Sequence, residues 1–362
     1  MSESTMPPAA AQSPTPHARL ATARERAAWL LVGLIALSVL LWASVVLLLL
    51  GMAVGSVGLE VLWPPYDAIT QQILWQIRLP RSLGAWLAGA LLGLAGALAQ
   101  GLFRNPLADP FLLGSASGAA LGTALALLLA GSGALGTAAG LVWLQHLGMT
   151  GMAFVGAAAA VLLALVLAQG AHNGLRLLLA GVVVGVVLGA LREVLELRHP
   201  DLLQPMKAFG LGSTALVGWP ACVQMAAVWL VCSAAAWMLA RVLDALTLGE
   251  ATAASLGLPL APLRAALIAV LALATGTAVA HTGLIAFVGL AAPHVVRGLV
   301  RAPYRRSLWL ASAMGGLLLL GADILARSLL APQELPVGVL TALLGGSYLL
   351  WLMHRGQQRE MA

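Results

Sequence analysis

The stretch from Arg78 to Gly118 reads RLPRSLGAWLAGALLGLAGALAQGLFRNPLADPFLLGSASG, and it decides the class of fold. It opens with two arginines and a proline and continues through a long apolar run that carries no charge. A polar turn with two prolines follows at 104–110, and the next apolar run starts with small residues only. A bilayer core about 30 Å thick requires roughly 20 apolar residues per helix, and Asn-Pro and Asp-Pro steps mark turns. The stretch therefore predicts two membrane helices joined by a short polar corner.

The rest of the chain has the same character. Of its 362 residues, 61% are hydrophobic and 9% are charged, and the mean hydropathy is +0.96. The apolar runs are too long, and alternate too little, for the short strands of a membrane β-barrel. We therefore expect an all-α polytopic membrane protein with about ten transmembrane helices. The expected spans are 27–52, 81–103, 111–131, 150–170, 175–197, 219–240, 262–281, 283–298, 306–329 and 335–353.

The first 26 residues are rich in Pro, Ser, Thr and Ala and are expected to form a disordered cytoplasmic tail. The membrane domain is expected at 27–353, and a second cytoplasmic tail at 354–362. With the N-terminus inside, thirteen of the 19 Lys and Arg residues fall on the cytoplasmic side, as the positive-inside rule requires. Because these residues are scattered between apolar runs, they indicate topology in a bilayer and not nucleic-acid binding.

The chain contains no G-x-x-x-x-G-K-[ST] motif, and its single lysine is Lys207 in QPMKAFG. A P-loop needs that lysine and the glycine-rich turn to hold nucleotide phosphates. The chain is thus not expected to be an ATPase itself. If transport is driven by ATP, a separate polypeptide hydrolyses it.

The longest inward loop reads RVLDALTLGEATAASLGLPLAPLRA. Thr247 followed three residues later by Glu250 has the spacing of a capping box, and Gly257 and Pro259 end the helix. A short helix at about 247–257 is expected, with Leu248 and Leu256 exposed. It lies either on the bilayer surface or in a groove of a partner protein.

The ninth span contains Asp323 and Arg327 one helical turn apart. Asp323 acts either as a proton-relay carboxylate or as the partner of Arg327 in an ion pair. Arg78, Arg81 and Arg327 all fall on the outer side, against the charge bias of that face. We expect a negative partner for them, either lipid phosphates or a protein. His294 has no further ligand type at metal-binding spacing, and no cofactor or metal site is expected.

Five separated motifs, spanning about Trp75 to Leu352, together resemble the permease subunits of ABC importers for iron-siderophores, haem and vitamin B12, the type II importer permeases. The motifs are RLPR with RNPLADP, FGLGSTALVGW, LTLGEATAASLGL, GLIAFVGLAAPHVVR and GADILARSLLAPQELPVG. The resemblance implies a homodimer with the path on its two-fold axis, two ATPase subunits below it and a periplasmic substrate-binding protein above it. It places the chain in the bacterial inner membrane. Leu284, Ala286 and Ser347 depart from the usual pattern, and the departures at Leu284 and Ala286 leave the local backbone bend there open.

The resemblance also implies roles for individual residues. Thr247, Leu248, Gly249, Glu250 and Leu256 match the coupling helix that contacts the ATPase. Asn105, Leu107, Gly114, Ser115, Gly338 and Gly345 match positions along the translocation path. Arg78, Arg81 and Arg327 match arginines that pair with glutamates of the binding protein.

We therefore expect the permease of an ATP-driven importer for a metal chelate, a ferric siderophore or haem, with cobalamin as the alternative. A secondary transporter would need ion-binding groups converging at the midplane, where after the first two spans only Asp323 lies well inside an apolar run. A passive channel would have no use for a capped helix that faces the cytoplasm.

Overall fold

The computed structural model describes residues 16–55, 58–59, 67–131, 142–170, 174–300 and 302–360, and these residues are almost entirely helical. The expected tails fall partly outside this range, at 1–15 and 361–362. Residues 16–26, expected in the disordered tail, are the first turns of the first helix.

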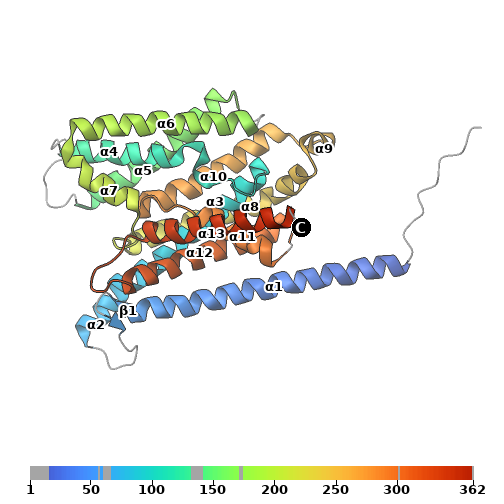
Figure 1. Ribbon diagram of the computed structural model, residues 1–362, viewed down its shortest axis with the longest axis horizontal. Helices are drawn as coiled ribbons and strands as arrows, with labels where there is room; N and C mark the ends of the chain where they lie inside the picture. Colours follow the sequence, from blue (N-terminus) through green and yellow to red (C-terminus); the bar gives the residue numbers. More distant parts are fainter. Residues whose placement is uncertain are drawn as a thin grey trace, which may run out of the picture.

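The long helices run antiparallel in a bundle (Figure 1). Their bounds are α1 Pro16–Ala53, α3 Leu79–Phe103, α4 Ser115–Gly131, α5 Val142–Leu167, α6 Gly174–Arg198, α8 Trp219–Thr247, α10 Leu260–Thr282, α11 Val288–Leu299, α12 Tyr304–Ser328 and α13 Val337–Glu360. The short elements are the strands β1 Val54–Gly55 and β2 Gly58–Leu59, the helices α2 Ala68–Ile73, α7 Leu203–Leu211 and α9 Glu250–Ser255, the π-helical η1 Leu74–Arg78, and the 3-10 turns η2 Pro110–Leu113 and η3 Pro200–Leu202.

Each of the ten expected spans coincides with one long helix, so the predicted fold class is confirmed. Among the described residues, seven helices are long and apolar enough to cross a membrane, and α4 and α13 contain shorter apolar helices. The boundaries differ most at the eighth span. Helix α11 begins at Val288, and not at 283, because Gly283 and Phe287 both adopt positive φ (+68° each) and bend the chain. The bend thus forms although Leu284 and Ala286 depart from the usual pattern.

Helix α3 is the centre of the bundle, with 89% of the span that contains it buried inside the protein. It packs against α8, α10, α11 and α12. Small residues permit this, because a Cβ on Gly96 would lie 1.7 Å from the carbonyl oxygen of Gly289 on α11. In a bilayer, helices associate through such close backbone contacts. The spans of α1 and α6, by contrast, are only 11% and 17% buried.

The bundle has two ends, which carry the candidate sites. One end holds α2, β1 and the connection between α12 and α13, and is called the α2 end (Figure 1). The opposite end holds α9 and the last described residues of α13, and is called the α9 end. Helix α1 extends past the rest of the bundle at the α9 end.

Candidate functional site

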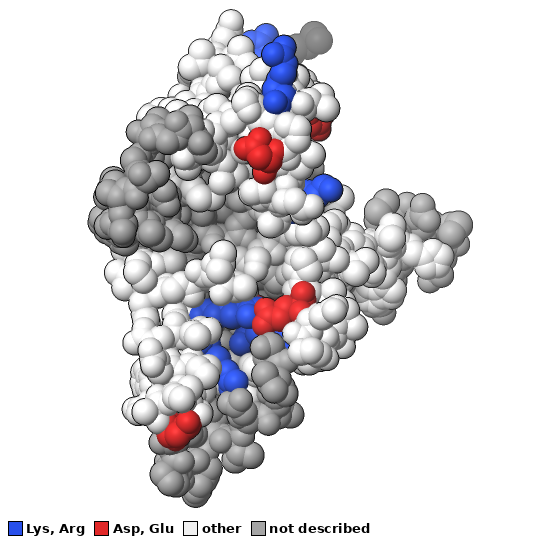
Figure 2. Space-filling model, turned by 90° about the vertical axis from the view of Figure 1, so that its left-hand side faces the viewer, with Lys and Arg blue, Asp and Glu red and all other residues white. Residues whose placement is uncertain are grey.

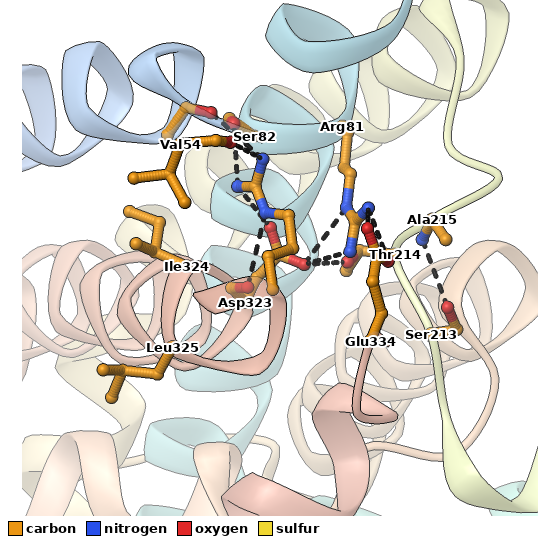
Figure 3. Close-up of polar contacts among 12 residues, drawn as sticks. Val54, Arg81, Ser82, Ser213, Thr214, Ala215, Asp323, Ile324, Leu325 and Glu334 are labelled. Atoms are coloured by element: carbon orange, nitrogen blue, oxygen red, sulfur yellow. Dashed lines mark hydrogen bonds and ion pairs between the residues drawn. The ribbon is translucent and has the colours of Figure 1, made fainter. Parts of the chain in front are cut away.

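The most concentrated group of charges lies at the α2 end and is centred on Asp323 of α12 (Figure 3). Oδ1 of Asp323 accepts hydrogen bonds from Nε and Nη2 of Arg81 at 3.3 and 3.2 Å. Its Oδ2 lies 2.7 Å from Nη2 of Arg327, one turn further along α12. The hydroxyl of Thr214 donates to Oδ1 at 2.5 Å. The Asp323 side chain is fully buried, so this carboxylate is stabilised by its partners and not by water.

Arg327 connects this carboxylate to the end of α1. Its Nη1 donates to the carbonyl oxygens of Gly51 and Val54 at 3.0 and 3.3 Å, and its Nη2 donates to the Ser82 hydroxyl at 3.2 Å. One side chain therefore holds α1, β1, α3 and α12 together. The ion pair between Asp323 and Arg327, one of the two alternatives from the sequence, is present in the structure.

A second carboxylate completes the group. Glu334, in the connection between α12 and α13, lies 2.9 Å from Nη1 of Arg81. Its side chain is 29% exposed, whereas that of Asp323 has no exposed area. Arg81, Arg327, Asp323 and Glu334 form two positive and two negative charges, and together they are called the α2-end charge cluster. The cluster is electrically neutral as a whole.

The three arginines expected to dock a partner are therefore buried in this chain. Arg78 donates to the carbonyl oxygen of Met52 at 3.2 Å, and Arg81 and Arg327 are neutralised by the chain's own acids. Figure 2 looks onto the α2 end and shows basic and acidic side chains in contact near the middle of a mostly uncharged face. An outside partner is thus not required to neutralise Arg81 and Arg327. Sequence reasoning missed Glu334 and Thr214, although Glu334 stands in the same motif as Asp323 and Arg327.

A second polar group lies at the α9 end. Oε1 of Glu250, the first residue of α9, lies 2.6 Å from Nη2 of Arg264 on α10 and 3.3 Å from Nη2 of Arg104 at the end of α3. Leu248 and Leu256 are 65% and 63% exposed on either side of the short helix. Glu250 thus links α9 to α10 and to the central helix α3.

The predicted capping box at this helix is wrong. Thr247 is the last residue of α8, and its hydroxyl donates to the carbonyl oxygen of Asp244 at 2.6 Å. Helix α9 begins at Glu250 with Gly249 at the N-cap, where φ is +104° and no side chain caps the helix. The glycine allows α8 to turn sharply into α9, which removes Thr247 from the cap position.

The corner after α3 is built by local hydrogen bonds. Arg104 adopts a left-handed conformation with φ of 50° and ends α3. The side chain of Asn105 accepts from the N–H of Leu107 at 2.9 Å, and that of Asp109 accepts from the N–H of Phe111 at 2.8 Å. Asn105 and Leu107 are exposed at this corner.

The remaining path candidates sit at helix contacts in the single chain. A Cβ on Gly114, whose φ is +79°, would lie 3.1 Å from the carbonyl oxygen of Gly181 on α6, and the adjacent Ser115 is buried. In α13, a Cβ on Gly338 would lie 2.1 Å from the carbonyl oxygen of Leu211. A Cβ on Gly345 would lie 2.3 Å from the Phe287 side chain. The structure therefore shows a packing role for these residues, and a role in a path stays a prediction.

The chain matches a known family of transport proteins. The model of the FecCD transport family matches residues 27–355, which is nearly the whole chain. The chain belongs to the FecCD transport family.

Relatives in this family have described transport roles. The chain is 38% identical to the hemin transport system permease protein HmuU of Yersinia pestis, covering 89% of this chain and 96% of the relative. It is also 38% identical to the vitamin B12 import system permease protein BtuC of Klebsiella pneumoniae, covering 88% and 94%. These two relatives are equally similar to this chain, yet they are named for the transport of chemically different ligands.

Solved structures agree with the fold. An inward-facing metal-chelate type ABC transporter superposes with a TM-score of 0.78 at 30% identity, covering 88% of this chain and 98% of that one. PsaBC from Streptococcus pneumoniae, at 19% identity and a TM-score of 0.53, shares the fold alone. This FecCD-family protein is therefore a multi-pass membrane permease subunit with the type II ABC importer fold.

Proposed function

We propose that this permease carries a metal chelate, haem or a ferric siderophore, from the periplasm to the cytoplasm, driven by ATP that a partner subunit hydrolyses. The observation that carries the proposal is the 38% identity to a hemin permease over nearly the full length of both chains, supported by the similarity to a metal-chelate type transporter. Cobalamin is the second candidate, because the identity to the vitamin B12 permease is equal.

In the proposed assembly, the α9 end faces the cytoplasm and two ATPase subunits, and both termini lie there. The α2 end faces the periplasm and the substrate-binding protein. Supporting this orientation, Arg104, Arg176, Arg241, Arg264 and Arg297 all fall at helix ends on the α9 side, as the positive-inside rule requires of a cytoplasmic face. The exposed Leu248 and Leu256 beside α9 offer an apolar contact for the ATPase.

The permease is proposed to act as a homodimer in the bacterial inner membrane. Many exposed positions along α6 and α13 carry apolar side chains. Such faces require contact with either lipid or a second protein. They include Leu179, Val183, Val186, Val187, Leu343 and Leu344. The path would lie between the two copies, with the corner at Asn105 and Leu107 at its cytoplasmic mouth.

The ligand is best identified through the binding protein that docks on this permease. The test is to co-purify that protein with the permease and ATPase and to measure its affinity for haem, a ferric siderophore and cobalamin. Preference for haem or the siderophore supports the metal-chelate proposal. Preference for cobalamin would replace it with the second candidate.

A further inference from the structure

Helices α8 and α12 pack against each other, and aromatic side chains recur along their contact. The indole N–H of Trp229 donates to the Ser312 hydroxyl at 2.8 Å, and its ring meets the edge of Trp309 at 5.9 Å between centroids. About two turns further along α8, the Arg305 guanidinium lies over the Trp237 ring, with Cζ 3.9 Å from the ring centroid. At the α9 end, the contact between these helices therefore finishes with a cation held on an aromatic face.

Arg305 has no carboxylate partner in the part of the chain that the structure describes. Its Nε atom is buried and makes no hydrogen bond there. Arg241, one turn beyond the tryptophan on α8, is exposed and likewise belongs to none of the ion pairs among the described residues. The arginines beside α9 differ, because Glu250 neutralises both Arg264 and Arg104. Two positive charges on α8 and α12 are thus left uncompensated within the described chain.

These two arginines lie at the same corner of the bundle. Asp244, three residues after Arg241, accepts the backbone N–H of Tyr304 with Oδ1 at 3.1 Å. Trp237 and Asp244, one before and one after Arg241 on α8, therefore both contact the first two residues of α12. The Asp244 carboxylate holds the start of α12 and forms no ion pair with Arg241 or Arg305.

The face of α8 that leads to this corner is apolar and exposed. Its large side chains are between 44% and 72% exposed, and they are Val223, Leu230, Val231, Trp237 and Met238. At 100° per residue these positions fall on one side of the helix, and Arg241 continues the same stripe. The surface is therefore apolar along its length and cationic at one end. A phospholipid has the matching shape and charge, with acyl chains that lie beside the stripe and a phosphate at its end.

We propose that Arg241, Arg305 and Trp237 form a binding site for the phosphate of an anionic phospholipid, in the leaflet at the α9 end. Guanidinium groups present forks of N–H donors that match phosphate oxygens. The indole fixes the orientation of Arg305, at the headgroup depth where tryptophans of membrane proteins are enriched. A zwitterionic lipid carries its own cation beside the phosphate, so the site should prefer an anionic lipid. The proposal requires only that the chain spans a bilayer, and it is independent of the imported ligand.

Two other accounts of the arginines lead to different expectations. If they only mark topology through diffuse attraction to the leaflet, replacing either one should equal replacing any other exposed arginine. If an acidic side chain of the ATPase pairs with them, lipid binding by the permease alone should not depend on them.

The test is native mass spectrometry of the purified full-length permease, titrated with dioleoylphosphatidylglycerol or with dioleoylphosphatidylcholine. The variants are Arg241→Gln, Arg305→Gln and the two combined. Arg198→Gln is the matched control, since Arg198 is exposed and is the last residue of α6, at the opposite end of the bundle. For phosphatidylglycerol we expect about five-fold weaker binding in each single variant and about thirty-fold in the double variant, equivalent to about 1 kcal/mol per arginine. The control should bind both lipids like the wild type.

A second variant separates the geometry of the site from its charge. Arg305→Lys keeps the charge and loses the planar fork that stacks on Trp237, so it should weaken phosphatidylglycerol binding less than Arg305→Gln does. Thermal unfolding adds a readout beside affinity, because phosphatidylglycerol should raise the unfolding temperature of the wild type and not that of the double variant. Variants are compared only when they are monodisperse without added lipid. If Arg305→Gln fails this check, Arg305→Lys and Arg241→Gln carry the test.

Four results would overturn the site. They are equal affinity of the wild type for the two lipids, wild-type affinity of the double variant for phosphatidylglycerol, an equal loss in the Arg198→Gln control, and displacement of the lipid by excess inorganic phosphate. The last would show a site for a free anion. If the double variant kept its lipid affinity but lost assembly with the ATPase, the arginines would face a protein and not a lipid. Uptake assays test the transport proposal separately, so the failure of either proposal leaves the other standing.

Discussion

Asp323 is the residue on which the α2 end depends most, because one buried carboxylate holds two arginines and a threonine from separate parts of the chain. We expect Asp323→Ala to destabilise the permease by about 3 to 5 kcal/mol, since it leaves two guanidinium groups poorly compensated in a dry site. The thermal unfolding temperature of the detergent-solubilised protein measures the loss. Glu193→Ala, on an exposed side chain, should stay within about 0.5 kcal/mol of the wild type. Equal unfolding temperatures for both variants would rule out a structural role for the cluster.

Asp109, in the corner between α3 and α4, should make the stability of the fold depend on pH. Burial raises the pKa of its carboxyl above the ordinary 3.8, and the hydrogen bond from the Phe111 N–H opposes the shift in part. A carboxyl with a raised folded-state pKa stabilises the fold below its unfolded pKa and loses that contribution as pH rises through the folded value. Asp109→Asn keeps an acceptor oxygen for Phe111 and stays neutral, so its advantage over the wild type should grow from about pH 4 upward.

Thermal unfolding of both proteins across pH 4 to 8 checks this expectation. The two curves should converge at the acid end and separate toward neutral pH, with the variant more stable. A wild type that is the more stable protein at pH 7 would show that the charged carboxylate is favoured in the corner.

Individual site residues were only partly predictable from sequence. The pair of Asp323 and Arg327 could be predicted because both residues lie one turn apart on one helix. The contacts of Arg81 with Asp323 and Glu334 join residues 242 and 253 positions apart, and no local spacing indicates them. Arg81 and Arg327 do have negative partners, and the chain itself supplies them as Asp323 and Glu334.

Among the elements, α3 depends on small residues where it crosses α11. A Cβ on Gly96 would come within 1.7 Å of the Gly289 carbonyl oxygen, so Gly96→Ala must push two buried backbones apart. We expect that variant to lose most of its folded yield in the membrane, because overpacking in a tight interior costs about 1 to 3 kcal/mol or more. The matched control is Gly321→Ala in α12, where an added Cβ meets nothing within 4 Å.

Yield and size-exclusion profile of the two variants give the measurement. Gly321→Ala should behave like the wild type or better, since alanine favours a helix over glycine. If both variants lost their folded yield, the helices would be intolerant of alanine in general. The effect could then not be assigned to the crossing of α3 with α11.

Helix α9 is the element through which the permease is expected to contact its ATPase. Glu250 bridges Arg264 and Arg104, so Glu250→Gln should loosen α9 from α10 and α3 and reduce ligand-stimulated ATP hydrolysis a few-fold in proteoliposomes. Thr247→Ala removes one hydrogen bond to Asp244 and should have a much smaller effect. A capping box would instead make the two variants similar, and equal losses would therefore contradict the bridge.

The long helices were predictable because an apolar run of span length has few alternatives to a helix in a bilayer. Of the short elements, only the helix at about 247–257 was expected, and its start was placed too early. Helix α7 and the bend at 283–287 depend on contacts such as that between the Leu284 N–H and the carbonyl oxygen of Phe209, which join separate parts of the chain. The Thr247–Glu250 spacing was misleading because Gly249, with its positive φ, places the start of α9 after the threonine.

The whole molecule is a buried central helix surrounded by spans whose outer faces remain apolar. The span containing α3 is 89% buried, while α6 is 17% buried, so the single chain leaves much of its apolar surface for lipid or a second copy. The neutral α2-end charge cluster and the Glu250 bridge lie at opposite ends of this scaffold. Helix α3 contacts both groups, through Arg81 at one end and Arg104 at the other.

We propose that this FecCD-family permease imports its ligand only together with a separate ATPase. The most direct measurement is uptake of radiolabelled ligand into proteoliposomes that contain the permease, its ATPase and the binding protein. Uptake should require all three proteins and ATP. It should stop when the P-loop lysine of the ATPase subunit is replaced. Uptake by the permease alone, driven by an ion gradient and indifferent to ATP, would contradict the account.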